Sequence, residues 1–324
     1  ERGRELFLRL AETTDVVIES SPPGAWETLG IGWETLHRRN PRLILVSITP
    51  FGQTGPYRDY AGGDLIAQAM GGLMYINGYP EDPPVRAGGR QAEYSSGIHA
   101  CAAALMALYG RDFTSPGEGQ WIDVSMQESV AAAVQPDINF WDLRGEVKKR
   151  EGNFIRGAGS GVFKTKDGYL ALHSGLRNWA DLADWLAMDG ADTSFMLDPV
   201  WDEPQTRILR RSEVDSLIEQ LCANRTMDEL ADEGQRRGLF TFPVFNAEQV
   251  AHDKQMAARH WFIDLPAPGG QGTLRYPGPP VRLHATPYVI RRPAPRLGEH
   301  NAEVYGSLGV APEDLPDLRK AMAI

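Results

Sequence analysis

The chain has 324 residues, of which 42% are hydrophobic and 23% charged, and its formal net charge is -10. These fractions are ordinary for a globular protein and exclude a disordered or fibrous chain. The acidic balance argues against nucleic acid as a partner, because neutralising phosphates requires a basic surface. It leaves room for a local basic pocket that binds a phosphorylated small molecule.

Cysteine content and hydropathy indicate the compartment. The only cysteines are Cys101 and Cys222, which excludes a disulfide scaffold and fits a reducing cytosol. No apolar stretch approaches the roughly 20 residues that span a bilayer, and the charged start, ERGRELFLRLAE, does not resemble a signal peptide. We expect a cytoplasmic protein with no membrane partner. Because the sequence starts within a helical pattern and without methionine, we also expect a segment upstream.

The first half of the sequence alternates helices with short apolar strands. Strands are predicted at residues 15–19 (DVVIE) and 43–48 (LILVSI), and each is bounded by turn or proline signals. A helix is expected at 64–74, a helix of small residues at about 96–110, and then a strand in QWIDVSM before another helix. This alternation predicts an α/β layer with parallel strands.

The pattern changes from about Trp141. Residues 144–161 are charged and then glycine-rich, which predicts an exposed excursion. A strand at 168–174 and helices at 179–188, 213–222 and 227–237 predict a second, smaller unit. The proline-rich end of the sequence, from Tyr276 to Asn301, is expected to run extended over a surface.

Several common catalytic signatures are absent from the sequence. The cysteines are isolated and no histidine pair has metal-ligand spacing, so we expect no metal. There is also no Walker A loop and no G-x-S-x-G nucleophile elbow.

Glu93 is the first candidate for chemistry, in VRAGGRQAEYSSGIHA. The start of a helix carries unpaired N–H groups and a positive dipole end, which favour an ionised and therefore nucleophilic carboxylate. The alternative is a helix-terminal charge that only stabilises the helix. His99, six positions further on, is expected to be a core or interface histidine rather than a base.

The glycine-rich segment GNFIRGAGSGVF is the second candidate. It is either a flexible linker or a lid whose backbone N–H groups approach a reacting centre. Phe154, Ile155 and Phe163 favour the lid, because linkers rarely carry such apolar anchors.

Further motifs occur along the sequence in NPRLILVSITPFGQTGPYRDYAGGDLIAQAMGGLM, VRAGGRQAEYSSGIHACAAALMALYGRD, SPGEGQWIDVSMQESV and the late segments FPVFNAEQVAHDKQMAARHWF and PGPPVRLHATPYVIRRPAPRLGEHN. Together these motifs resemble the class III CoA-transferases, the group of formyl-CoA transferase, carnitine CoA-transferase and α-methylacyl-CoA racemase. The resemblance covers essentially the whole chain.

The resemblance implies an α/β fold with a Rossmann-like large domain and a second, smaller α+β domain, in an interlocked-ring homodimer. We expect the large CoA-binding domain at residues 1–145, the small domain at 146–275 and the return to the large domain at 276–324. The family begins with a Rossmann-like segment that has no counterpart at the start of this sequence. We expect the missing segment to comprise at least one βαβ unit, of roughly 30 residues.

The resemblance also implies the chemistry, with acyl-CoA and a carboxylic acid as substrates. Glu93 stands where the family has a nucleophilic aspartate, which forms covalent acyl and CoA intermediates. The segment formed by Gly157, Ala158, Gly159, Ser160 and Gly161 matches the glycine loop that covers them.

Two departures bear on this assignment. The family's Asn-Phe-Arg-Pro-Gly strand end is Ser-Ser-Pro-Pro-Gly here, so Ser20 and Ser21 keep the CoA turn. The candidates for the missing charge are Arg58, Arg86 and Arg90. Gly63 replaces the histidine of the racemase branch, and α-carbon racemisation needs two acid/base groups, so a racemase or isomerase is the less favoured activity. The aspartate-to-glutamate change keeps another alternative open, an inactive structural half of an assembly.

Overall fold

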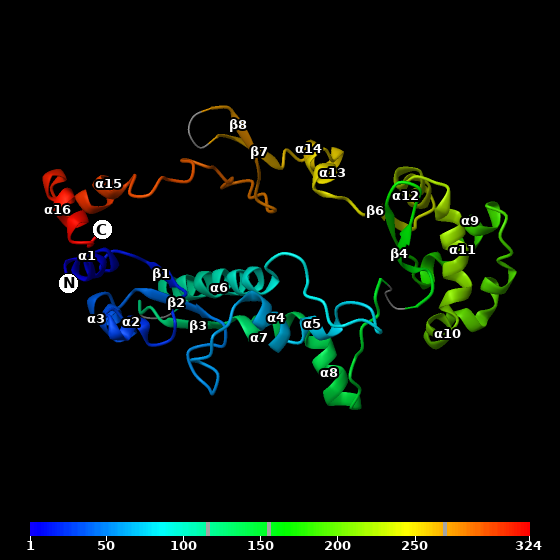
Figure 1. The fold of residues 1–324 in the computed structure, drawn as a ribbon, viewed down its shortest axis with the longest axis horizontal. Helices are drawn as coiled ribbons and strands as arrows, with labels where there is room; N and C mark the ends of the chain where they lie inside the picture. The colour runs from blue at the N-terminus through cyan, green and yellow to red at the C-terminus, as the bar shows by residue number, and fades with distance from the viewer. Residues whose placement is uncertain (115–116, 154–156, 268–270) are drawn as a thin grey trace. The chain divides into compact units, whose positions relative to one another are not determined.

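The computed structural model describes residues 1–114, 117–153, 157–267 and 271–324. The chain divides into two units (Figure 1), the first formed by Glu1–Gly152 with Ala294–Ile324 and the second by Asn153–Pro293. The changes of unit at 152 and 293 lie later in the chain than the 145 and 275 expected from the sequence.

The first unit contains a parallel sheet in the order β1-β2-β3, formed by β1 (Val16–Glu19), β2 (Ile44–Thr49) and β3 (Trp121–Ser125). The central strand is apolar along most of its length because a parallel strand is covered on both faces. Ile44 and Val46 pack on one face with Ala100 and Ala104. Leu45 packs on the other face with Leu8, Leu36 and Leu43.

Helices cover both faces of this sheet. The helices of the first unit are α1 (Arg2–Ala11), α2 (Ala25–Thr28), α3 (Trp33–Arg39), α4 (Asp64–Met70), α5 (Leu73–Ile76), α6 (Gln91–Tyr109), α7 (Met126–Ala133), α8 (Gln135–Arg144), α15 (Asn301–Gly306) and α16 (Leu315–Lys320). The two chain ends meet in this unit, since a Cβ on Gly3 of α1 would lie 2.8 Å from the Ala323 carbonyl oxygen.

Two helices differ from the sequence prediction. The small-residue helix α6 begins at Gln91 rather than near Ser96, because the Asp64 carboxylate satisfies N–H groups of its first turn. The single helix expected at 64–74 is broken at Gly71 and Gly72. Gly72 has a φ of +89°, and a Cβ on Gly71 would lie 2.6 Å from the Val130 side chain, so α7 packs too close for a larger residue.

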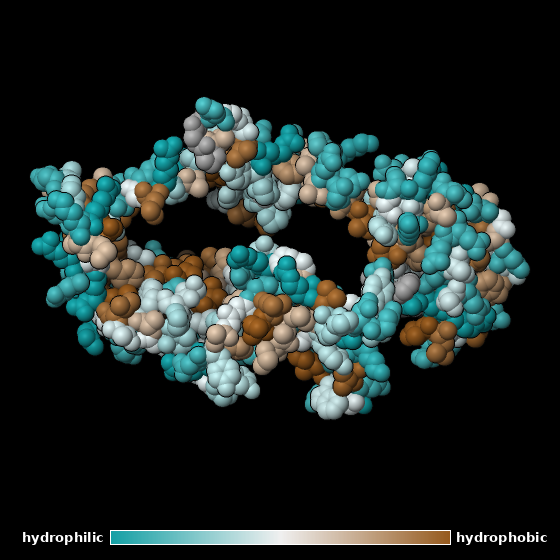
Figure 2. Space-filling view, in the orientation of Figure 1, coloured by the Kyte–Doolittle hydropathy of each residue, from teal (hydrophilic) through white to brown (hydrophobic). Residues whose placement is uncertain are grey.

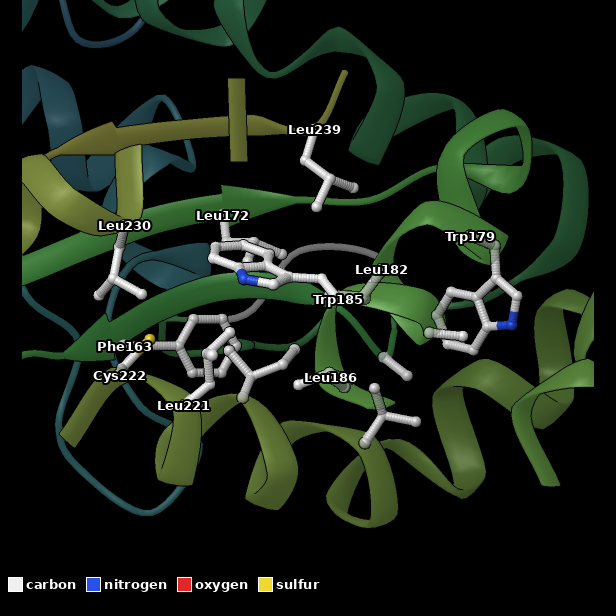
Figure 3. Close-up of a cluster of buried hydrophobic side chains, with 14 of the residues drawn as sticks. Phe163, Leu172, Trp179, Leu182, Trp185, Leu186, Leu221, Cys222, Leu230 and Leu239 are labelled. Atoms are coloured by element: carbon white, nitrogen blue, oxygen red, sulfur yellow. The ribbon is translucent and has the colours of Figure 1, made fainter. Parts of the chain in front are cut away.

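The second unit contains an antiparallel sheet in the order β4-β5-β6, formed by β4 (Ser160–Lys164), β5 (Tyr169–His173) and β6 (Phe240–Pro243). One face packs on α9 (Trp179–Met188), α11 (Arg211–Ala223) and α12 (Met227–Arg236), and α10 (Pro204–Leu209) lies between α9 and α11 in the chain. Figure 3 shows the resulting core, in which Phe163 and Leu172 of the sheet meet Trp185 and Leu221 of the helices.

The rest of the second unit follows β6. It comprises α13 (Ala247–Ala251), α14 (Lys254–Ala258) and a hairpin of β7 (Phe262–Pro266) with β8 (Thr273–Pro277), after which the chain runs exposed and without regular structure to the first unit.

Short 3₁₀ turns lie at Leu176–Asn178, Ser194–Leu197, Pro199–Asp202 and Pro312–Asp314, and a π turn at Gly110–Thr114. Within the described residues, none of the helices is both long and apolar enough to cross a membrane.

Candidate active site

Glu93 is the third residue of α6, so its carboxylate lies in the first turn of the helix. The side chain is 42% exposed, and its Oε2 lies 3.0 Å from Nη1 of Arg90. The Glu93 carboxylate raises the pKa of Arg90 through this hydrogen bond. The site therefore holds an accessible carboxylate at the positive end of a long helix, beside a guanidinium that can neutralise an anion.

Asp64 fixes the start of α6. Its Oδ1 accepts hydrogen bonds from the backbone N–H of Ala92 at 2.9 Å and of Glu93 at 3.4 Å. Its Oδ2 accepts a hydrogen bond of 2.7 Å from Nε2 of Gln68, whose Oε1 in turn accepts the N–H of Ala87 at 3.0 Å. Gln68 is fully buried. These hydrogen bonds therefore connect α4, and the segment around Ala87 that precedes α6, to the first turn of α6, which carries Glu93.

The sequence interpretation missed Asp64 and Gln68 as site residues. The sequence signal that could have identified Asp64 is the Gly-Gly-Asp motif at the start of α4. The sequence analysis uses this motif only to show that position 63 is glycine rather than histidine. Nothing in the local pattern shows that the Asp64 carboxylate caps a helix that starts 27 positions later, at Gln91.

The two faces of α6 differ sharply in residue size. The buried side carries small residues at Ala92, Ser96, Ala100, Ala104 and Ala107, which let the helix lie close to the sheet. His99 is exposed. The interpretation of His99 as a core residue is therefore wrong, while its interface interpretation stays a prediction.

Three of the four residues predicted to bind CoA lie near one turn. Ser20 and Ser21 follow β1, where the Ser21 N–H donates to Glu19 Oε2 at 2.6 Å and Ser21 Oγ accepts the Trp26 indole N–H at 2.9 Å. A Cβ on Gly24, at the end of this turn, would lie 3.6 Å from Nη2 of Arg58. A cation therefore stands beside the turn that lacks one in its own sequence.

Arg86 lies apart from that turn, on the approach to α6. Its Nη1 donates a hydrogen bond of 2.9 Å to the carbonyl oxygen of Gly89, just before Arg90 and the helix. The structure thus groups Arg86 with the Glu93 segment rather than with Ser20 and Ser21.

The glycine segment lies in the second unit. Phe154 and Ile155 lie outside the described residues, but Gly157, Ala158, Gly159, Ser160 and Gly161 are all buried. An exposed excursion is therefore wrong for these five residues, because Ser160 and Gly161 begin β4 and pack against the core. Their role as a lid stays a prediction.

The Asp215 side chain and the Arg207 backbone hold this segment. The Gly159 N–H donates a hydrogen bond of 3.1 Å to Oδ1 of Asp215, and the Ala158 N–H donates one of 2.8 Å to the Arg207 carbonyl oxygen. Burial raises the pKa of Asp215 to about 6. The Arg207 guanidinium lies 3.9 Å above the Trp179 ring, and its burial lowers the pKa of Arg207.

The described residues hold no group of three or more histidine, cysteine, aspartate or glutamate side chains that could bind a metal ion. The groups that the site presents are the Glu93 carboxylate, the side chains of Arg86 and Arg90, and backbone N–H groups of the first turn of α6.

Comparison with known proteins places the chain in a family. The model of CoA-transferase family III matches residues 1–301, and the chain belongs to this family. A succinyl-CoA--D-citramalate CoA-transferase from Chloroflexus aurantiacus is 33% identical over 324 residues, covering 99% of this chain and 79% of that protein. A formyl-CoA:oxalate CoA-transferase from Streptomyces avermitilis is 31% identical, covering 98% of this chain and 80% of that protein.

Solved structures agree with this assignment. The crystal structure of a CAIB/BAIF family protein from Brucella suis matches with a TM-score of 0.82 and 30% identity, covering 95% of this chain and 79% of that chain. The chain therefore has the mixed α/β fold of these structures, and it is a CoA-transferase.

Proposed function

We propose that the chain moves CoA from an acyl-CoA donor to a carboxylic acid acceptor, with Glu93 as the covalent nucleophile. The observation that carries this proposal is an accessible carboxylate, 42% exposed, in a helix turn that Asp64 and Gln68 hold in place. The relatives named above transfer CoA between acyl groups and small carboxylic acids, which supports substrates of that class.

The reaction balances without an external acid or oxidant. A Glu93 oxygen attacks the thioester carbonyl carbon, the C–S bond breaks, and CoA leaves as a thiolate, so that a mixed anhydride of Glu93 and the donor acid remains. The thiolate then attacks the Glu93 carbonyl carbon and releases the donor acid, leaving a glutamyl-CoA thioester. The acceptor carboxylate repeats the sequence in reverse and leaves Glu93 as a free carboxylate.

Trapping tests the nucleophile. After incubation with succinyl-CoA, hydroxylamine is added and the chain is digested for mass spectrometry. We expect a hydroxamate at Glu93, and Glu93→Gln to lose both the hydroxamate and at least about 10³-fold in turnover, because an amide is a poor nucleophile. An unmodified Glu93 in a turning-over enzyme would exclude this mechanism.

For CoA binding we propose the strand-end turn of a Rossmann-like sheet. Ligands of parallel α/β sheets bind beyond the carboxyl ends of the strands, and Ser20 and Ser21 lie at such an end with Arg58 beside them. Arg86 would contact the thioester end, near Glu93. Calorimetry with CoA should show weaker binding for Arg58→Ala, whereas a chain that binds no CoA would support the structural-half alternative.

We further propose that the glycine segment covers the covalent intermediates and that the protein works in the cytoplasm, as a homodimer. Cys101 and Cys222 are both free thiols, which supports a reducing compartment.

Racemisation is not expected, since no side chain at Gly63 can take the second proton-transfer role. Incubation of a 2-methylacyl-CoA in deuterium oxide should leave the α-carbon unlabelled.

A further inference from the structure

The second unit contains a cavity of about 730 Å³ between the end of α14 and the segment that follows β8. Volumes of this size are typical of small-molecule sites. The backbone holds the two walls together, because the Gly278 N–H donates a hydrogen bond of 2.8 Å to the Trp261 carbonyl oxygen. A Cβ on Gly278 would lie only 2.2 Å from that oxygen, so the close approach requires glycine.

The residues that line this cavity are basic, whereas the whole chain has a negative net charge. Arg259, His260, Arg282 and His284 all line the cavity, and no lining residue is acidic. Among the described residues, neither the Arg259 nor the Arg282 side chain forms a hydrogen bond or ion pair. In a chain of net charge -10, two unpaired guanidinium groups around one cavity provide forked donors suited to a phosphate or carboxylate.

The backbone adds an independent observation. His260 has a φ of +48°, a left-handed conformation directly after the α14 cap. Glycine adopts this conformation at helix ends without cost, whereas a side chain there is strained. At this helix end, the Trp261 N–H donates a hydrogen bond of 3.1 Å to the Met256 carbonyl oxygen. A histidine that keeps its imidazole in the cavity lining at the cost of backbone strain indicates binding rather than folding.

The rest of the cavity is apolar and aromatic, with Met256, Ile263 and Leu283 beside the rings of Trp261 and Tyr288. We propose that this cavity is a binding site for a small organic anion, one that carries a phosphate or carboxylate group on an apolar or aromatic body. The guanidinium groups of Arg259 and Arg282 bind the anionic group, and the apolar wall binds the body.

Calorimetry on the full chain tests this site with two probes, adenosine monophosphate for phosphate esters and phenylsuccinate for dicarboxylates. We expect at least one to bind with a dissociation constant below about 1 mM. Arg259→Ala and Arg282→Ala should each weaken it about tenfold, the cost of one charged hydrogen bond. Arg275→Ala is the matched control, because Arg275 lies on β8 and does not line the cavity.

His260→Gly separates binding from folding. Relief of the left-handed strain should raise the melting temperature, while loss of the imidazole weakens the probe. Arg58→Ala separates this cavity from the proposed CoA site, and it should leave probe binding unchanged. The proposal is overturned if neither probe binds, if both cavity arginine variants bind like wild type, or if Arg58→Ala alone abolishes binding.

Discussion

At the scale of single residues, the Glu93 side chain is one methylene longer than the aspartate that the family resemblance implies at this position. Asp64 and Gln68 fix the backbone of the helix turn, so a shorter side chain withdraws its carboxylate from the reacting carbon. We expect Glu93→Asp to form the covalent adduct but to lose about 10²-fold in kcat, as an error of about 1 Å does. Single-turnover adduct formation followed by mass spectrometry measures this. Faster turnover than wild type would show that the site fits aspartate.

Asp215 gives a second prediction at this scale, because its carboxyl is buried behind the glycine segment. Burial raises its pKa from 3.8 to about 6, so the folded state holds the proton more tightly than the unfolded chain. The stability that this proton adds is complete below about pH 4 and lost as pH rises through 6. The shift corresponds to about 3 kcal/mol at neutral pH.

Asp215→Asn removes that titration and keeps a carbonyl oxygen for the Gly159 N–H. We expect the variant to be more stable than wild type at pH 7.5 and equal to it near pH 4. Urea unfolding at both pH values checks this, with the fluorescence of Trp179, Trp185 and Trp201 reporting on the second unit, in whose core all three lie. Equal stability at pH 7.5 would contradict the raised pKa.

At the scale of elements, the cap on α6 carries the next prediction. Asp64→Ala removes the acceptor for two N–H groups of the first turn, which costs about 1 kcal/mol and lets the Glu93 turn move. We expect kcat to fall about 10- to 100-fold with KM little changed. Asp64→Asn should restore part of it, because its amide oxygen can accept the same hydrogen bonds.

The matched control for that prediction is Asp253→Ala. Asp253 caps the five-residue helix α14 through the Met256 N–H at 2.8 Å, so its loss costs a similar amount of stability but removes no hydrogen bond from the Glu93 turn. If both variants lose activity equally, the effect is general destabilisation rather than positioning of the nucleophile.

Local pattern identified the elements that carry their own signal. The strand β2 is a continuous apolar run, and α9, α11 and α12 have clear helical periodicity and small boundary errors. The strands β4 and β6 were not predicted. β4 begins inside the glycine segment, and β6 has only four residues. Leu170 of β5 pairs with Pro243, a contact far along the chain that no local pattern reveals.

The candidate site shows the same division. Glu93 was found because a carboxylate at a helix start has a local signature. The Asp64 cap and the place of Arg58 beside the Gly24 turn depend on packing between distant segments. The burial of the glycine segment was missed for a related reason. Its small residues look flexible in sequence, but Gly159, at a φ of +74°, would place a Cβ 3.0 Å from Leu182, so small residues are needed there for close packing.

At the scale of the whole molecule, the outer face of α6 lacks a cover among the described residues. Large apolar side chains are exposed there at Ile98, Leu105, Met106 and Tyr109, at 61 to 74%. Apolar residues also gather over this region in Figure 2. Exposed apolar stripes of this kind mark interaction surfaces. Because the resemblance implies a homodimer, we propose a second copy of the chain as the occupant.

Charge insertion tests that interface. We expect wild type to run as a dimer in size-exclusion chromatography with light scattering, and Met106→Asp to yield monomer or aggregate, because an aspartate cannot be buried unpaired there. Met188→Asp is the control, since Met188 on α9 is 75% exposed and should tolerate the change. A monomeric wild type would exclude the homodimer and favour a related chain as the partner.

The interlocked-ring arrangement that we expect from the resemblance makes a stricter prediction than dimerisation alone. Two chains that pass through each other cannot separate without unfolding of a unit, whereas two surfaces in contact exchange partners on dilution. Tagged and untagged dimers mixed at 25 °C should therefore form no mixed dimer over a day by native mass spectrometry, although urea unfolding and refolding of the mixture should produce about half mixed dimers. Exchange within minutes in native buffer would show that the α6 faces meet as separable surfaces, and the ring arrangement would be wrong.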